Sequence, residues 1–233
     1  MANKKSETSA VKGHSKVVEA YLIAYNGIQT LGWTYLLFQL VTFYLASTND
    51  NKSLYDTVKC TVIVFQNAAV LEVLHAALGM VKSNPVITAF QVASRVMVVC
   101  GVLMATQAAR ESIGLTLALT AWSVTEIIRY ATYTLSLLNV VPYFLKWLRY
   151  TLFIGLYPLG VTGELLCLYA AQKEVGDGQL YTITMPNPYN VLFNYQHLLW
   201  FIMLLYIPLF PQLYLHMVSQ RRKVLGGVPK KIN

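Results

Sequence analysis

The stretch LRYTLFIGLYPLGVTGELLCLY, residues 148–169, is mostly apolar and long enough to cross a bilayer as one helix, which takes about 20 residues. It nevertheless contains Tyr157, Pro158 and Glu164. A charge at mid-bilayer costs at least ~2.5–3.5 kcal/mol on insertion scales, so an ionisable residue inside a span indicates function. Proline removes a helical hydrogen bond and disturbs the helix. The stretch therefore predicts both a membrane fold and a candidate site within it.

The composition of the whole chain is typical of a membrane protein. Its 233 residues are 56% hydrophobic and 12% charged, whereas a soluble domain carries about 25% charged residues. Mean hydropathy is +0.49. The net charge of +8 would suit a nucleic-acid partner, but the basic residues cluster at the two ends and in short connections. That distribution is typical of membrane topology signals, so we predict membrane lipids as partners and no nucleic acid.

Six apolar runs are long enough to cross a bilayer as helices. They lie at 19–45, 57–79, 86–106, 113–138, 146–171 and 190–217. The predicted fold is therefore all-α, a polytopic membrane bundle of six transmembrane helices. At this length we expect a single domain, residues 1–233, with short cytosolic tails at 1–16 and 219–233. No cleavable signal peptide is expected, so the first span would act as its own insertion signal.

The distribution of lysine and arginine predicts the orientation of this bundle. Four basic residues fall on one side, namely Lys52, Lys59, Arg110 and Lys173. Twelve fall on the other, namely Lys4, Lys5, Lys12, Lys16, Lys82, Lys146, Arg149, Arg221, Arg222, Lys223, Lys230 and Lys231. The remaining two, Arg95 and Arg129, lie inside spans. The excess predicts that both termini are cytosolic, as an even number of spans also requires.

The C-terminal residues KKIN predict the compartment. Lys230 and Lys231, fourth and third from the end, resemble the dilysine signal that retrieves membrane proteins to the endoplasmic reticulum. The signal requires a cytosolic C-terminus, which the charge distribution predicts independently. We therefore expect a multi-pass protein of the endoplasmic reticulum membrane.

Polar side chains inside the predicted spans form pairs at helical spacing, so each pair shares a helix face. The pairs are Glu72 with His75, Gln91 with Arg95, and Glu126 with Arg129. The simplest interpretation is that they join helices, for example Glu72 with Arg95. Glu72-x-x-His75 also matches half of a di-iron carboxylate site, but the second Glu-x-x-His is missing from the sequence. We therefore predict no metal site and interpret Glu72, Gln91, Glu126 and Arg129 as structural polar residues.

Tyr157 and Glu164 share a face of the fifth predicted span. Seven residues correspond to about 700° of rotation, which leaves the two within about 20° of each other and roughly 10.5 Å apart along the axis. Pro158 leaves one helical carbonyl without its amide donor and favours a kink. Small residues reduce the bulk of the same segment, namely Gly155, Gly160 and Gly163. They would serve close helix packing or leave room for a substrate, and the segment resembles a pocket wall.

Four segments of the chain resemble the very-long-chain (3R)-3-hydroxyacyl-CoA dehydratases, also described as protein-tyrosine-phosphatase-like proteins. The segments are YNGIQTLGW (25–33), LEVLHAALGMVKSNP (71–85), WSVTEIIRYATYTL (122–135) and LYPLGVTGE (156–164). The resemblance covers nearly the whole chain, and it implies that Tyr157 and Glu164 are the catalytic pair. It also implies an acyl-CoA substrate, and as partners the other elongation-cycle enzymes: the elongase, the ketoacyl reductase and the enoyl reductase.

The implied reaction removes a proton from C2 and hydroxide from C3 of a 3-hydroxyacyl thioester, so it needs one base and one acid and no cofactor. Glu164 as base with Tyr157 as acid, and the opposite assignment, both remain open. Phosphates of CoA would bind near Arg149 and Lys146; Arg149 is the favoured contact, and for Lys146 anchoring of the helix to the membrane surface is the alternative role. Arg95 would steady the thioester if it faces the same cavity.

Two other function classes are compatible with the spans and the charge distribution. One is a non-catalytic protein that binds acyl-CoA or lipid, or a scaffold of a membrane lipid-synthesis complex. The other is a transporter, which is less well supported because the sequence lacks an inverted repeat and paired broken helices. Turnover by the purified protein distinguishes an enzyme from both.

Overall fold

The computed structural model describes residues 16–46 and 52–225, and within these ranges every regular element is a helix. The helices are α1 (Lys16–Leu45), α2 (Leu54–Ala68), α3 (Val70–Ala77), α4 (Pro85–Val96), the π-helix η1 (Met97–Leu103), α5 (Gln107–Glu111), α6 (Ile113–Leu137), α7 (Tyr143–Arg149), α8 (Phe153–Asp177) and α9 (Tyr195–Leu225). One isolated β-bridge joins Ile183 to Phe193 in the loop before α9. The predicted all-α class is confirmed.

Four helical segments of the described chain are long and apolar enough to cross a membrane. They are Leu54–Ala77, Pro85–Leu103, Phe153–Asp177 and Tyr195–Leu225. Each corresponds to a span predicted from the sequence. The first is divided at Ala69 into α2 and α3, and the second continues from α4 into η1. These four segments fit a membrane protein.

Two predicted boundaries are wrong. The span predicted at 146–171 begins only at Phe153, because the chain turns between α7 and α8. Charge accounts for this difference: α7 carries Lys146 and Arg149, whereas α8 has no basic residue before Lys173 and can enter the apolar core. At the other boundary, α9 continues to Leu225, well into the predicted tail. Basic residues in a last helical turn interact favourably with the helix dipole.

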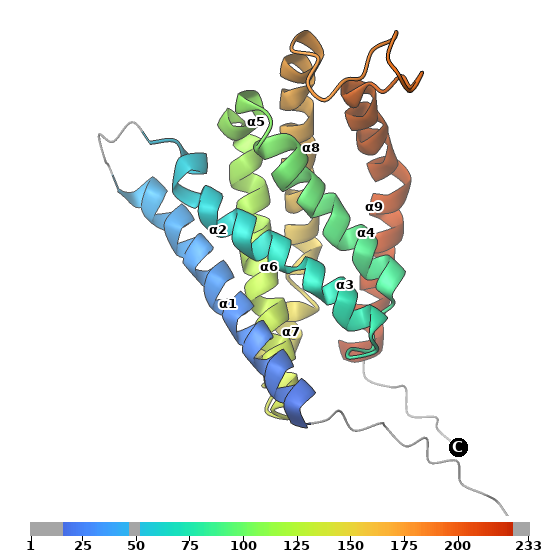
Figure 1. Ribbon diagram of the computed structural model, residues 1–233. Helices are drawn as coiled ribbons and strands as arrows, with labels where there is room; N and C mark the ends of the chain where they lie inside the picture. The colour runs from blue at the N-terminus through green and yellow to red at the C-terminus, as the bar shows by residue number, and fades with distance from the viewer. Residues whose placement is uncertain (1–15, 47–51, 226–233) are drawn as a thin grey trace, which may run out of the picture.

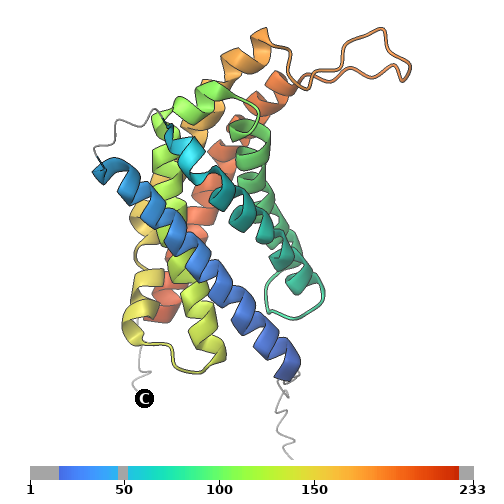
Figure 2. The ribbon, with the colours of Figure 1, turned by 60° about the vertical axis from the view of Figure 1, so that its left-hand side comes forward.

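Helix α6 lies at the centre of the bundle, where it packs against α1 on one side and α8 on the other, and α8 in turn packs against α9. The N-terminal end of α1, the short helix α7 and the C-terminal end of α9 lie at the lower end of the bundle in Figure 1. Helix α5 and the loop between α8 and α9 lie at the opposite end, and this loop extends sideways beyond the helices (Figure 2). The two chain ends of the described bundle therefore leave it on the same side.

Helix α1 has polar residues inside and apolar residues outside. Asn26 and Gln29 are 7% and 1% exposed, whereas Ile28 and Leu31 on the opposite face are 61% and 71% exposed. Gln29 donates from Nε2 to the Phe65 carbonyl of α2 at 3.3 Å. In water this distribution would be unfavourable, but lipid solvates apolar side chains and leaves polar groups to pair inside the bundle.

Close packing of α6 on α8 depends on two glycines. A Cβ atom on Gly114 would lie 2.6 Å from the Gly163 carbonyl oxygen, and one on Gly163 would lie 2.7 Å from the Gly114 carbonyl oxygen. Gly160 is close to Ala121 of α6, whereas Gly155 has open space beside it. Gly163 and Gly160 therefore allow helix contact, and only Gly155 leaves unfilled room. This contact fixes where α8 places the side chains on its other faces.

Candidate active site

Glu164 lies at the meeting point of three helices. It projects from α8, is 7% exposed, and accepts hydrogen bonds on both carboxylate oxygens. Trp122 of α6 donates from Nε1 to Oε1 at 2.8 Å, and the Tyr206 hydroxyl of α9 donates to Oε2 at 2.6 Å. Both donors are neutral. The carboxylate is thus oriented by hydrogen bonds, and no cation of the described residues forms an ion pair with it.

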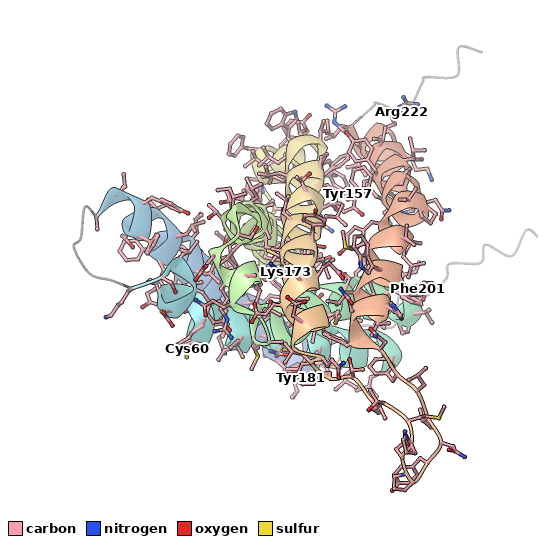
Figure 3. All side chains as sticks on the ribbon, turned by 90° about the horizontal axis from the view of Figure 1, so that it is seen from above. Cys60, Tyr157, Lys173, Tyr181, Phe201 and Arg222 are labelled. Atoms are coloured by element: carbon pink, nitrogen blue, oxygen red, sulfur yellow. The ribbon has the colours of Figure 1, made fainter. Side chains whose placement is uncertain are left out.

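Tyr157 lies on the side of α8 that faces α9 (Figure 3). Its half-buried ring stacks on Phe210 with centroids 5.2 Å apart and planes inclined by 5°, and Tyr214 lies 6.3 Å away. Because Tyr206, which binds Glu164, also projects from α9, Tyr157 and Glu164 share the face of α8 that contacts α9. The hydrogen bonds of the described residues include none to the Tyr157 hydroxyl, so this group can donate to a ligand.

The other intramembrane charges form a separate ion cluster. Arg129 of α6 makes two bonds to Glu72 of α3, at 2.9 and 3.0 Å, and donates from Nε to Glu126 at 2.7 Å. Arg95 of α4 also pairs with Glu126, and the Tyr130 hydroxyl donates to Glu72. Two carboxylates and two guanidinium groups therefore balance inside the bundle, as buried charges require.

This cluster corrects one expectation. Glu72 pairs with Arg129 rather than with Arg95, because Arg129 on the central helix α6 reaches α3, while Arg95 on α4 reaches Glu126. Gln91, which we predict to be a structural polar residue, is exposed on α4 and lies outside the cluster, so its role stays a prediction. Arg129 pairs with Glu72 of α3 and with Glu126 of its own helix, and the structural role of these three residues stays a prediction.

Glu164 differs from Glu72 and Glu126 in its partners. Among the ion pairs of residues 16–46 and 52–225, Glu72 and Glu126 each face an arginine and Glu164 takes part in none. Its nearest link to the cluster is indirect: the guanidinium carbon of Arg95 lies 5.7 Å from the ring centroid of Trp122, the residue that donates to Glu164. A carboxylate without a counter-ion can accept a proton from a substrate more readily than one held by two arginines.

The basic residues expected to bind CoA lie on α7, apart from α8. Arg149 donates to the Tyr133 hydroxyl at 3.3 Å, and its guanidinium group lies 4.7 Å from the centroid of the Tyr133 ring. Lys146 is exposed. Because a turn separates α7 from α8, Arg149 and Tyr157 do not lie on one continuous helix, although the span predicted at 146–171 places them on one.

Two partners of Glu164 were missed by the sequence reasoning. Tyr206 lies in the last apolar run, where the spacing of Tyr206, Phe210 and Tyr214 by four residues indicates one aromatic helix face. That pattern was available in the sequence, although it did not specify which helix the face meets. Trp122 begins the segment WSVTEIIRYATYTL, but nothing in the sequence indicates that its indole points to α8.

Comparison with known proteins identifies the family. The family model described as Protein tyrosine phosphatase-like protein, PTPLA, matches residues 66–227. Very-long-chain (3R)-3-hydroxyacyl-CoA dehydratase 2 of Mus musculus is 50% identical over 215 residues, covering 92% of this chain and 84% of the relative. Very-long-chain (3R)-3-hydroxyacyl-CoA dehydratase hpo-8 of Caenorhabditis elegans is 49% identical over 215 residues, covering 92% and 98%.

A more distant relative extends the comparison to plants. Very-long-chain (3R)-3-hydroxyacyl-CoA dehydratase PASTICCINO 2 of Arabidopsis thaliana is 33% identical over 213 residues, covering 91% of this chain and 96% of the relative. No solved structure matches the chain. The similarity extends over nearly the full length of the chain and of these relatives. The chain therefore belongs to the protein tyrosine phosphatase-like family of very-long-chain (3R)-3-hydroxyacyl-CoA dehydratases.

Proposed function

We infer that the protein dehydrates very-long-chain 3-hydroxyacyl-CoA to trans-2-enoyl-CoA, the dehydration step of fatty acid elongation. It is an enzyme, a carbon–oxygen lyase of lipid biosynthesis. The relatives compared are all named as dehydratases, which favours this function over a non-catalytic carrier or scaffold. The elongase and the two reductases remain predicted partners.

Tyr157 and Glu164 are the proposed catalytic pair. The observation that carries the proposal is that Glu164 is a buried carboxylate with two neutral donors and no ion pair in the described chain, on the same face of α8 as a free phenol. Arg95 is engaged by Glu126 and faces Trp122, so we place it with the ion cluster rather than on the thioester. Turnover by purified variants lacking either group tests the pair.

The pair can complete the reaction without another reactant. Glu164 takes the proton from C2, and the electrons of that C–H bond form the C2–C3 double bond. The C3–O bond breaks with both electrons going to oxygen, which takes the Tyr157 proton and leaves as water. The product water then carries the proton from Glu164 to the tyrosinate, which restores the resting state. We assign Glu164 as base because two neutral groups contact its carboxylate oxygens and, among the described residues, no arginine pairs with it.

Arg149 is the proposed contact for a CoA phosphate, with Lys146 beside it. Arg149→Leu should raise KM for 3-hydroxyacyl-CoA roughly tenfold, the effect of losing a charge-assisted hydrogen bond. It should leave kcat nearly unchanged, because the contact is far from the reacting carbons. Steady-state kinetics check this result. The matched control is Lys173→Leu, which removes an exposed charge at the other end of α8. An equal KM increase with an acyl-pantetheine thioester, which lacks the nucleotide phosphates, would contradict the proposal.

The proposed topology has six spans, with α1 and α6 added to the four apolar segments. These helices have 30 and 25 residues, about 45 and 38 Å at 1.5 Å per residue, and the apolar core of a bilayer is about 30 Å thick. Their lower hydropathy reflects buried polar residues such as Gln29 and Glu126. A single domain over residues 1–233 remains a prediction.

The proposed orientation places both termini in the cytosol and the protein in the endoplasmic reticulum. The basic residues of α7 and of the last turn of α9 lie at the same end as the start of α1, which fits the positive-inside rule. Lys4, Lys5, Lys12, Lys230 and Lys231, which also supported this orientation, lie outside the described residues.

A glycosylation tag tests orientation and compartment together. A tag inserted after Pro188, in the loop between α8 and α9, should be modified, and its glycan should stay sensitive to endoglycosidase H. A tag at the C-terminus should stay unmodified. Modification of the C-terminal tag would reverse the orientation, and glycans resistant to the enzyme would place the protein beyond the endoplasmic reticulum.

A further inference from the structure

The hydrogen-bond partners of Glu164 come from two helices that the catalytic pair itself does not use. Trp122 on α6 is 2% exposed and Tyr206 on α9 is half-buried. We propose that Trp122 and Tyr206 are positioning residues, which hold the Glu164 carboxylate in one orientation toward the C2 proton. The proposal rests on the assignment of Glu164 as a catalytic residue.

The two hydrogen bonds fix the plane of the carboxylate. They bind opposite oxygens, at 2.8 and 2.6 Å, from helices that flank α8. With only one of them the group could rotate about its terminal bond, which has a broad rotational profile. Each carboxylate oxygen has two lone pairs, so each retains one that can accept a proton from the substrate. The contacts therefore orient the base without blocking it.

The two neutral donors stabilise the buried Glu164 carboxylate without neutralising its charge, so it can still act as a base. A buried carboxylate needs hydrogen bonds or a counter-ion, and Glu126 meets this need with Arg95 and Arg129. An indole and a phenol stabilise the charge of Glu164 less strongly than a guanidinium group would. Arg95 lies over the ring of Trp122 and pairs with Glu126 instead.

Helix α9 positions both members of the catalytic pair. Tyr206 binds Glu164, and Phe210, one turn further along α9, stacks on Tyr157. Phe210 also stacks near Tyr214, with centroids 5.8 Å apart, so the aromatic face continues for a second turn. Because α9 contacts both groups, its aromatic face orients the side chains of the acid and the base, which both project from α8.

A double-mutant cycle between Tyr206 and Glu164 tests the proposal in the full-length purified protein. Tyr206→Phe should lower kcat for 3-hydroxyacyl-CoA roughly 10- to 100-fold, which is what a misplaced catalytic group or a lost hydrogen bond to a charged group costs. KM should change less than about twofold, because Tyr206 does not bind the substrate. In the Glu164→Gln background, Tyr206→Phe should have almost no further effect, since the residue acts through the carboxylate. Trp122→Phe should show the same dependence on Glu164.

The matched control is Tyr169→Phe, which removes a hydroxyl from the exposed face of α8, where Tyr169 is 62% exposed, and should leave kcat unchanged. Equal losses from Tyr206→Phe in both backgrounds would indicate a structural role and overturn the proposal. Normal kcat for Tyr206→Phe beside a slow Glu164→Gln would overturn the positioning role alone. Near-normal turnover by Glu164→Gln would overturn the catalytic assignment, and the positioning role with it.

Discussion

Glu164→Gln should slow the conversion of 3-hydroxyacyl-CoA to trans-2-enoyl-CoA at least about a hundredfold, because loss of a general base typically costs 10²–10⁴-fold in rate. The substitution keeps the shape of the side chain and removes its charge. It creates no cavity, so expression and membrane insertion should be retained. Turnover per folded molecule, measured with purified protein, checks the prediction.

Glu126→Gln is the matched control, because it makes the same chemical change at another buried glutamate. Glu126 is 1% exposed and pairs with Arg95 and Arg129. Removing its charge leaves Arg95 without its carboxylate partner and Arg129 with Glu72 alone, and breaking a buried ion pair costs about 3–5 kcal/mol of stability. This variant should therefore lower the unfolding temperature more than the turnover per folded molecule. The opposite pattern, with Glu126→Gln slow but stable and Glu164→Gln active, would move the base to the ion cluster.

Tyr157→Phe should also slow dehydration at least about a hundredfold, and its defect should depend on the leaving group. The variant keeps the ring that stacks on Phe210 and removes only the hydroxyl. A lower rate therefore measures the contribution of proton donation by that hydroxyl. A 3-fluoroacyl-CoA substrate expels fluoride, which needs far less help from an acid than hydroxide does. With that substrate, Tyr157→Phe should recover most of its rate relative to the unmodified enzyme, while Glu164→Gln stays slow.

The fluorinated substrate also separates the two possible assignments of acid and base. Recovery by Glu164→Gln, with Tyr157→Phe remaining slow, would exchange the two roles. Loss of 3-fluoroacyl-CoA turnover by both variants would mean that neither group acts mainly on the leaving hydroxyl. Release of fluoride and formation of the enoyl product are both measurable, so substrate decay by another route is detected.

The sequence predicted those features that depend on residues close together in the chain. The helical class follows from apolar runs of about 20 residues, and the shared face of Tyr157 and Glu164 follows from a spacing of seven residues. Tyr157 and Glu164 both contact α9, as expected for two residues on one face of α8. The pairing of Glu126 with Arg129 follows in the same way from a spacing of three.

Features that depend on how helices are rotated against one another were not predictable in this way. Helix α9 is apolar on all sides, so hydrophobic periodicity does not predict which way the Tyr206 side chain points. The sequence alone also does not show that α9 packs against α8. The same limit explains why Glu72 was paired with Arg95 rather than Arg129. The turn between Arg149 and Phe153 was missed because no glycine or proline marks it, so α7 and α8 read as one continuous span.

The central claim, that Tyr157 and Glu164 serve one transition state, is tested most directly by the turnover rate of the double variant Tyr157→Phe/Glu164→Gln. Residues that act together are strongly non-additive, so the double variant should be within a few-fold of the slower single variant. Unfolding curves of all three proteins should match that of the unsubstituted enzyme. Near-normal turnover in both single variants, or a double loss equal to the product of the single losses, would contradict the claim.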